Sequence, residues 1–554
     1  MRHARRFLLP CAEDRIHNSS RRRAVKSVSE PHQRVKAQSQ KEKVKMALNL
    51  ISSIIVFAIQ VLVNFLLAPF ILRSLGDEAY GLLTLANSLV SYGYILTMVI
   101  NSVSGRFIAF EYHAGRVLLA SKYYSSVLVI NIIFSLLICL SSALFIYKID
   151  AIINLSPELK SDAQIAFGLY FANFCLGLFN GIFSALAFVV NKVYLIAFRS
   201  ALASLVFAAL VFGLYYFLEP MISYSAFAAL ISSIVVFISS LFIVKKLGLG
   251  VRFRLRYTRL RLLKALFKSG AFNSFNSLSY SIINGADLLL CNLLLNPAMV
   301  GIMAISKSLI ITIESFIAML SGVFSPKLTE LYAKNLKAEL VYNLRFALRA
   351  QAFICLPPLC AFVGLGAEFY ALWLPFKNEE QIAFIYALAM IAAAPALFLA
   401  CMYPLLSLNI IVNSLRRPAM ANLIMALCTF CSQFALLSLT NLGLWAMFVC
   451  ASVCYMARIV LFDIANAARN LELKGSTFFI DFARNLVAFI ALLAIILVLK
   501  NLILLSFSWL LLLLFGALFC LFGYLFLFFV LFNKEQRTLF LELIKAKFLK
   551  VKKC

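Results

Sequence analysis

Three charged residues stand inside long apolar stretches, where an unpaired charge costs at least about 2.5–3.5 kcal/mol at the centre of a membrane helix. Lys307 lies about 13 Å from the start of the stretch 298–324, at about 1.5 Å per helical residue. Asp287 reaches a similar depth in the preceding stretch, 270–295. Glu314 follows Lys307 by seven positions and therefore shares its helix face. An ammonium at this depth can bind an anion, and a carboxylate can bind a cation.

Two uses of these charges stay open. Asp287 and Lys307 either form a structural pair that neutralises two buried charges, or form a pair that opens when a substrate or a coupling cation arrives. Glu314 either binds H⁺ or Na⁺ for coupling, or pairs with a neighbouring arginine or contacts headgroups.

The elements that must position these charges are membrane-spanning helices. Apolar residues make up 63% of the chain and charged residues 13%, a balance that excludes an ordinary soluble domain. Runs of about 20 apolar residues predict an all-α polytopic membrane protein with about 14 transmembrane helices. The predicted spans are 47–72, 82–103, 125–147, 163–189, 195–217, 221–243, 270–295, 298–324, 350–375, 381–411, 419–438, 443–466, 483–499 and 502–532.

The basic residues predict how the chain is oriented. With the N-terminus in the cytoplasm, the loops on that side carry 23 Lys or Arg and the outer loops carry 5. This asymmetry, and a basic tail over 533–554, predict that both termini are cytoplasmic. The basic segment 1–45 is expected to be a disordered cytoplasmic tail, or else to precede a native start at Met46.

The loops and the charge distribution also exclude several functions. No predicted outer loop exceeds about fifteen residues, no predicted span contains His, and no outer loop carries paired carboxylates. We therefore expect no enzyme activity, no catalytic residues, no metal site and no cofactor. The net charge of +28 follows from membrane topology and not from nucleic-acid binding, because the basic residues lie in tails and alternate loops.

The chain resembles itself after a shift of 220 residues. The shift aligns Leu75, Gly81, Ser88, Leu89 and Val103 with Leu295, Gly301, Ser308, Leu309 and Val323. It predicts two six-helix lobes related by a parallel repeat, plus two extra C-terminal helices. The predicted parts are an N-lobe (46–243), a basic linker (244–268) that lies on anionic lipid, a C-lobe (269–466), the last two spans (467–532) and the basic tail.

Short motifs in both lobes resemble one known family. The motifs are Asn64-x4-Pro69, Leu75-Gly76-x3-Tyr80-Gly81, Val300-Gly301-x2-Ala304-x2-Lys307 and Pro326-Lys327-Leu328. They resemble the polysaccharide transporters, the Wzx-like O-antigen and oligosaccharide flippases of the multidrug, oligosaccharidyl-lipid and polysaccharide exporter superfamily. The resemblance covers residue 46 to about 535. It implies a flippase of the bacterial inner membrane that moves a polyprenyl-pyrophosphate-linked oligosaccharide from the cytoplasmic to the outer leaflet, for O-antigen lipopolysaccharide, capsule or exopolysaccharide.

The resemblance gives further polar residues a predicted role. Lys307 becomes the main phosphate contact, supported by arginines that together suit a diphosphate, although each alone could extend to the membrane interface. These arginines are Arg106, Arg199, Arg345, Arg349 and Arg458. Asparagines within the spans either contact glycan hydroxyls or form hydrogen bonds between helices. They are Asn64, Asn87, Asn273, Asn276 and Asn284.

Two other functions remain open. One is a cation-coupled multidrug exporter of related architecture, which would favour acidic and aromatic cleft residues. The other is a non-transporting scaffold for a glycan-assembly complex. The predicted partners are the lipid-linked oligosaccharide, membrane lipids and other polysaccharide-assembly proteins, with no nucleic acid.

Overall fold

The computed structural model describes residues 19–190, 192–412, 414–501, 508–534 and 536–537. Every regular element in these ranges is a helix, which confirms the all-α prediction. Twelve helical stretches among the described residues are long and apolar enough to cross a membrane, so the chain is a multi-pass membrane protein. A count of about 14 spans stays a prediction, since the stretch Ile51–Ser91 covers most of the predicted span 47–72 and the first half of 82–103, and the span near 270–295 is not among the twelve.

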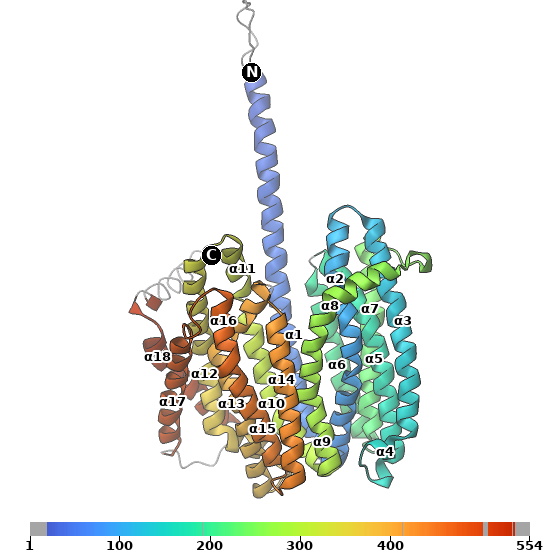
Figure 1. The fold of residues 1–554 in the computed structure, drawn as a ribbon, viewed down its shortest axis with the longest axis vertical. Helices are drawn as coiled ribbons and strands as arrows, with labels where there is room; N and C mark the ends of the chain where they lie inside the picture. The colour runs from blue at the N-terminus through green and yellow to red at the C-terminus, as the bar shows by residue number, and fades with distance from the viewer. Residues whose placement is uncertain (1–18, 191, 413, 502–507, 535, 538–554) are drawn as a thin grey trace, which may run out of the picture.

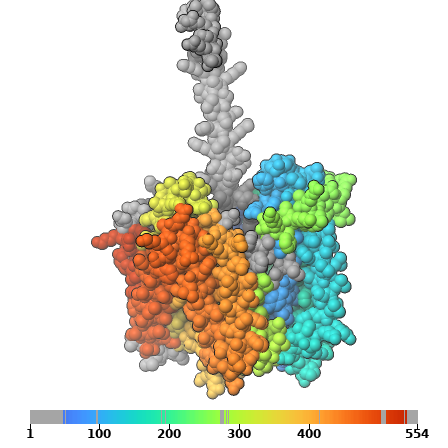
Figure 2. Space-filling model, viewed as in Figure 1, coloured from blue at the N-terminus to red at the C-terminus, as the bar shows by residue number. Residues whose placement is uncertain are grey.

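The helices form two groups that lie side by side (Figures 1 and 2). The first group comprises α2 (Gly93–His113), α3 (Val117–Tyr147), α4 (Ile149–Ile152), η1 (Pro157–Leu159), α5 (Lys160–Val189), α6 (Val193–Phe217) and α7 (Ile222–Leu247). The second comprises α10 (Pro297–Gly322), α11 (Ser325–Ala333), α12 (Lys337–Trp373), α13 (Glu379–Ile411), α14 (Arg416–Leu439), α15 (Leu444–Arg458), η4 (Ile459–Asp463), α16 (Ile464–Asn470), α17 (Phe479–Asn501) and α18 (Trp509–Leu531).

Helices between the two groups connect them. The long helix α1 (Ser19–Ser91) packs against α6 of the first group and α10 of the second. After the short η2 (Leu255–Tyr257), the chain runs through α8 (Leu260–Ser281), the π-helical turn η3 (Ile282–Ala286) and α9 (Asp287–Leu294). Helix α8 contacts α2 and α14, and it also joins the two groups.

Helix α1 is two helices joined at Gly76, where φ is 80° and ψ is 175°. Only glycine adopts this backbone conformation easily. The break lies within the predicted loop 73–81. Before the break, α1 extends back to Ser19, so residues 19–45 of the segment expected to be disordered are helical in the structure. Lys, Arg and Gln, which are good helix formers, are frequent there and favour a helix.

The core is shared at one end of the molecule and divided at the other. Near α4 and α9, apolar residues of both groups form common clusters, for example Phe167 and Phe174 of α5 with Met303 and Phe448 of α10 and α15. Near α11 and α16, where α1 projects from the bundle (Figure 1), each group has a cluster of its own. We call these the joined end and the split end.

The second arm of α1 meets α10 of the second group at the joined end through a reciprocal glycine contact. A Cβ on Gly81 would lie 2.5 Å from the carbonyl oxygen of Pro297, and one on Gly301 would lie 2.1 Å from that of Asp77. Both pairs follow the 220-residue shift, because 81 corresponds to 301 and 77 to 297. The second arm of α1 and helix α10 therefore cross as equivalent elements of the two halves.

Candidate functional site

The candidate site is centred on an ion pair at the junction of the two groups. Lys307 of α10 donates a hydrogen bond to Oδ2 of Asp287, the first residue of α9. The Asp287 side chain is 1% exposed, whereas that of Lys307 is 17% exposed and remains partly accessible. The Lys307 ammonium also lies 5.4 Å from the centre of the Phe448 ring. An accessible cation held by a buried carboxylate can exchange that partner for another anion.

The local backbone explains how Asp287 reaches Lys307. The π-helical turn η3 ends directly before Asp287 and changes the register of the helix that continues as α9. Such turns often occur at functional sites. Gly285 in this turn lets Tyr92, at the α1–α2 junction, approach closely, since a Cβ there would lie 2.9 Å from the Tyr92 hydroxyl. The first half of the chain thus reaches the ion pair.

Glu314 lies two helical turns from Lys307 on α10 and belongs to a second polar cluster. Its charge is close enough to act on Tyr403 of α13 and Tyr455 of α15. Within the described part of the chain, Glu314 makes no hydrogen bond or ion pair. The cluster therefore offers a partly buried carboxylate for a cation.

Arg458 lies beside this second cluster but is already paired. It forms a 3.0 Å ion pair with Asp463 and a hydrogen bond with Asn422, and its guanidinium carbon lies 4.8 Å from the centre of the Tyr455 ring. The five-residue spacing of Arg458 and Asp463 fits the π-helical turn η4 and not an ordinary α-helical turn. That is why sequence spacing did not reveal Asp463.

The other predicted arginines lie in separate places. Buried Arg199 donates hydrogen bonds to Ser184 and Ser240 and so ties α6 to α5 and α7. Exposed Arg106 of α2 donates a 3.0 Å hydrogen bond to Ser269 of α8.

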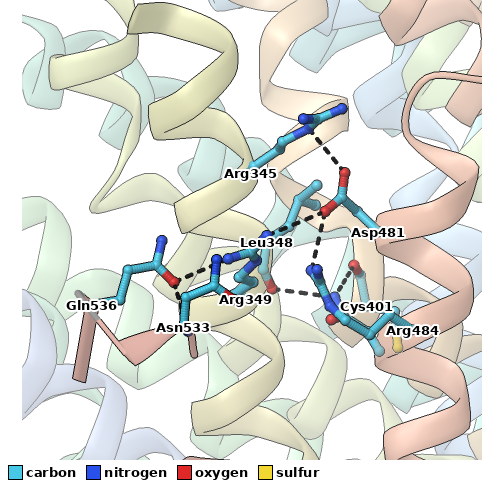
Figure 3. A network of polar contacts seen from close by, with 9 residues as sticks. Arg345, Leu348, Arg349, Cys401, Asp481, Arg484, Asn533 and Gln536 are labelled. Atoms are coloured by element: carbon cyan, nitrogen blue, oxygen red, sulfur yellow. Dashed lines mark hydrogen bonds and ion pairs between the residues drawn. The ribbon is translucent and has the colours of Figure 1, made fainter. Parts of the chain in front are cut away.

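Arg345 and Arg349 of α12 surround Asp481 of α17 together with Arg484 (Figure 3). The structure thus brings Asp287 together with Lys307, but it distributes the predicted cationic residues over several positions.

The predicted glycan contacts are only partly described. Asn64 and Asn87, on the two arms of α1, are exposed and available for contact. The side chains of Asn273, Asn276 and Asn284 lie outside the described part of the structure. Their roles stay predictions.

Contacts that the sequence did not predict tie the connecting helices α1 and α9 to the two groups at the joined end. Lys377, between α12 and α13, contacts both carboxylate oxygens of Asp77 at 2.6 and 2.5 Å. Asn154, after α4, and buried Asn292 of α9 exchange three hydrogen bonds of 2.8–2.9 Å. Partners 300 and 138 residues apart leave no local sequence signal.

Solved structures share this fold. The lipid II flippase MurJ in an inward closed conformation aligns with a TM-score of 0.60 at 16% identity, covering 85% of this chain and 98% of that one. An inward-facing multidrug resistance MATE family transporter of the MOP superfamily aligns with a TM-score of 0.58 at 17% identity, covering 76% and 99%. At these identities the likeness shows the fold alone.

Sequence comparisons identify a relative and a family. The chain is 25% identical to the uncharacterized membrane protein EpsK of Bacillus subtilis (strain 168), over 78% of this chain and 85% of EpsK. Residues 46–332 match the model of a family described as polysaccharide biosynthesis protein. That match covers more than half of the chain, includes both arms of the reciprocal glycine contact and contains Asp287, Lys307 and Glu314. The chain therefore belongs to the polysaccharide biosynthesis protein family.

Proposed function

We propose that this protein is a flippase that moves a polyprenyl-pyrophosphate-linked oligosaccharide across a bacterial inner membrane by alternating access. The glycan travels from the cytoplasmic to the outer leaflet, where it is used to build a surface polysaccharide. Both termini lie in the cytoplasm, so the split end faces inward. Membership of a polysaccharide biosynthesis family and the fold shared with a lipid II flippase support this proposal.

The observation that carries the proposal is the Asp287–Lys307 pair. Diphosphate oxygens can replace the carboxylate as partners of Lys307, because charge-assisted hydrogen bonds to phosphate and to carboxylate are alike in geometry. The bound anion then interacts with the same ammonium that holds Asp287. Substrate binding would thereby loosen a contact at the junction of the two groups.

The two ends of the molecule fit an alternating cycle. In the structure, the shared apolar core and the Asp77–Lys377 and Asn154–Asn292 contacts hold the joined end together. The substrate enters at the split end, where the cores are separate. For the glycan to leave, the contacts at the joined end must part while the groups approach each other at the split end.

Glu314 is the proposed site for coupling to H⁺ or Na⁺. It has no ion-pair partner among the described residues, and two tyrosine side chains lie near it. Binding a cation there would remove a partly buried negative charge next to the Lys307 face of α10. The energy of an ion gradient could thus bias the position of α10.

Deletion of the gene tests the function. Mass spectrometry would compare the amount and leaflet exposure of polyprenyl-pyrophosphate glycans with those of a complemented strain. We expect completed glycan units to accumulate on the cytoplasmic side. Unchanged lipid-linked glycans would contradict the proposal and point to export of drugs or other small solutes.

Variants of the central ion pair test the mechanism. Lys307→Ala should abolish surface display of the glycan, whereas Arg416→Ala, at the exposed start of α14, should leave display intact. Because Lys307→Ala leaves Asp287 buried and unpaired, the double variant Lys307→Ala/Asp287→Ala is also needed. It should restore the amount of folded protein but not display. Recovery of display in the double variant would make the pair purely structural.

A further inference from the structure

A cluster of three arginines surrounds a single aspartate at the split end, away from the central ion pair. Asp481 lies in the first turn of α17, 3.1 Å from Arg345, 4.0 Å from Arg349 and 3.0 Å from Arg484. Figure 3 shows the guanidinium groups converging on this carboxylate from α12 and from α17 itself. The four side chains carry a net charge of +2, so the cluster is not neutral.

The cluster retains hydrogen-bond donors that Asp481 cannot satisfy. The Nε atoms of Arg349 and Arg484 are buried and have no hydrogen-bond partner among the described residues. Arg349 gives one further hydrogen bond, to Gln536 beyond α18 at 3.0 Å. Buried donors normally have a partner, so these N–H groups show that the cluster has more hydrogen-bond donors than Asp481 and Gln536 satisfy.

The exposed fraction of the three arginine side chains increases from the interior toward the surface. The side chain of Arg349 is 12% exposed, that of Arg484 is 30% and that of Arg345 is 44%, while that of Asp481 is only 6%. An incoming anion can therefore reach the cluster from the surface and interact with guanidinium groups that are partly removed from water. Charge-assisted hydrogen bonds are strongest under these conditions.

The surroundings indicate that the anion is attached to a lipid. Helices α17 and α18 lie at the margin of the second group (Figure 1). On α17, Ile480, Val487 and Ile490 are exposed, forming an apolar stripe that begins at the level of Asp481. Such a surface is solvated by acyl or prenyl chains. A ligand with a phosphate next to a hydrocarbon chain fits both the arginines and the stripe.

We propose that the three arginines, Arg345, Arg349 and Arg484, bind the phosphate of a lipid headgroup at the lipid-facing side of α12 and α17. Two lipids carry this chemistry, an anionic glycerophospholipid and a polyprenyl diphosphate. The site is separate from Lys307, and its existence does not depend on whether the protein is a flippase. A lipid bound here would connect α12, α17 and the segment after α18 through one anion.

Binding of purified full-length protein to defined lipids tests the proposal. The protein in detergent micelles would be titrated with dioleoylphosphatidylglycerol and, separately, with undecaprenyl diphosphate, and bound lipid would be counted by native mass spectrometry. Arg349→Gln/Arg484→Gln should weaken binding of the preferred lipid about tenfold or more, the effect expected for loss of charge-assisted hydrogen bonds. Arg469→Gln, which removes an exposed charge on α16 at the same end, should change binding little.

The variant Asp481→Asn distinguishes a lipid-binding role of the arginines from a purely structural role, in which their ion pairs with Asp481 only hold α17 against α12. It removes the only carboxylate of the cluster and leaves every arginine in place. If the arginines bind a phosphate, this variant should bind the lipid at least as tightly as the original protein. If they serve only Asp481, lipid binding in all variants should equal that of the original protein, and the proposal fails.

The two lipids distinguish the source of the phosphate. Tighter binding of undecaprenyl diphosphate would make the cluster an entry site for a lipid-linked diphosphate. Equal or tighter binding of phosphatidylglycerol would make it a site for a structural phospholipid. Both results support the phosphate site, and neither depends on transport, so failure of this proposal is distinguishable from failure of the proposed function.

Discussion

The joined end and the split end hold the same two groups of helices in different ways. At the joined end, apolar clusters include residues of both groups, and polar contacts such as Asp77–Lys377 tie the connecting helix α1 to the second group. At the split end each group has its own core. The difference teaches that the joined end resists separation of the two groups, whereas the split end has no shared core to break. The central ion pair lies between these two ends.

Because of this asymmetry, separating the helices at the joined end is the larger energetic cost of a conformational change. Separating it exposes apolar surface, at about 25 cal/mol per Å² where that surface meets water, and breaks buried polar contacts. Substitutions there should consequently affect stability more than substitutions at the split end. The following changes test this ranking, from the largest expected effect to the smallest.

Gly301→Ala should cause the largest loss of stability. The added Cβ would lie 2.1 Å from the Asp77 carbonyl oxygen, so the backbones of α1 and α10 must move apart. Overpacking of this kind costs about 1–3 kcal/mol or more. The thermal unfolding midpoint in detergent should fall. Gly213→Ala, on α6 with nothing within 4 Å of the new Cβ, should leave the midpoint unchanged or raise it. Equal behaviour of the two variants would contradict the close crossing.

Asn292→Ala should have the next largest effect. It removes the two hydrogen bonds that the Asn292 side chain makes with Asn154 and leaves a backbone N–H and C=O of that residue without these partners, at a cost of about 1–3 kcal/mol. The unfolding midpoint should fall clearly. The control is Asn343→Ala on α12, since Asn343 bonds only within its own helix among the contacts described. A midpoint lowered equally by both changes would argue against a special role for the joined end.

Asp77→Asn should have a smaller effect of about 1 kcal/mol, because the Asp77 side chain is 22% exposed and water partly compensates for the lost ion pair. A double-mutant cycle with Lys377→Met would measure the coupling in the unfolding free energy. We expect the two single changes to be non-additive. Additive changes would mean that the pair contributes nothing at the joined end.

Glu472→Gln should have the smallest effect, since it removes an exposed ion pair with Lys337 at the split end. The hydrogen bond and charge of Lys337 lower the pKa of the Glu472 carboxyl. Any stabilisation from this pair is therefore present above the carboxyl's unfolded-state pKa and disappears as pH falls through its folded-state pKa. The unfolding midpoint at neutral pH should not change measurably; a clear decrease would show that the split end also depends on polar contacts.

The sequence predicted the helical membrane fold because long apolar runs have few other solutions. Depth counting along two apolar stretches also put Asp287 and Lys307 at one level, where the structure joins them. It could not place Arg345 and Arg349 correctly in relation to Lys307, since depth says nothing about position around the bundle. It missed Asp463 because a π-helical turn changes the spacing, and Lys377 because its partner lies 300 residues away.

The reciprocal glycine contact has a consequence for the origin of the chain. When residue i meets residue j and the equivalent of j meets the equivalent of i, the interface has the symmetry of an isologous dimer. A half-length ancestor with one such glycine could have paired with a second copy of itself through this surface. Gene duplication and fusion would then have enclosed that dimer in one polypeptide, and afterwards Lys307 could arise on one copy alone, at a position where its counterpart in the other half is Asn87.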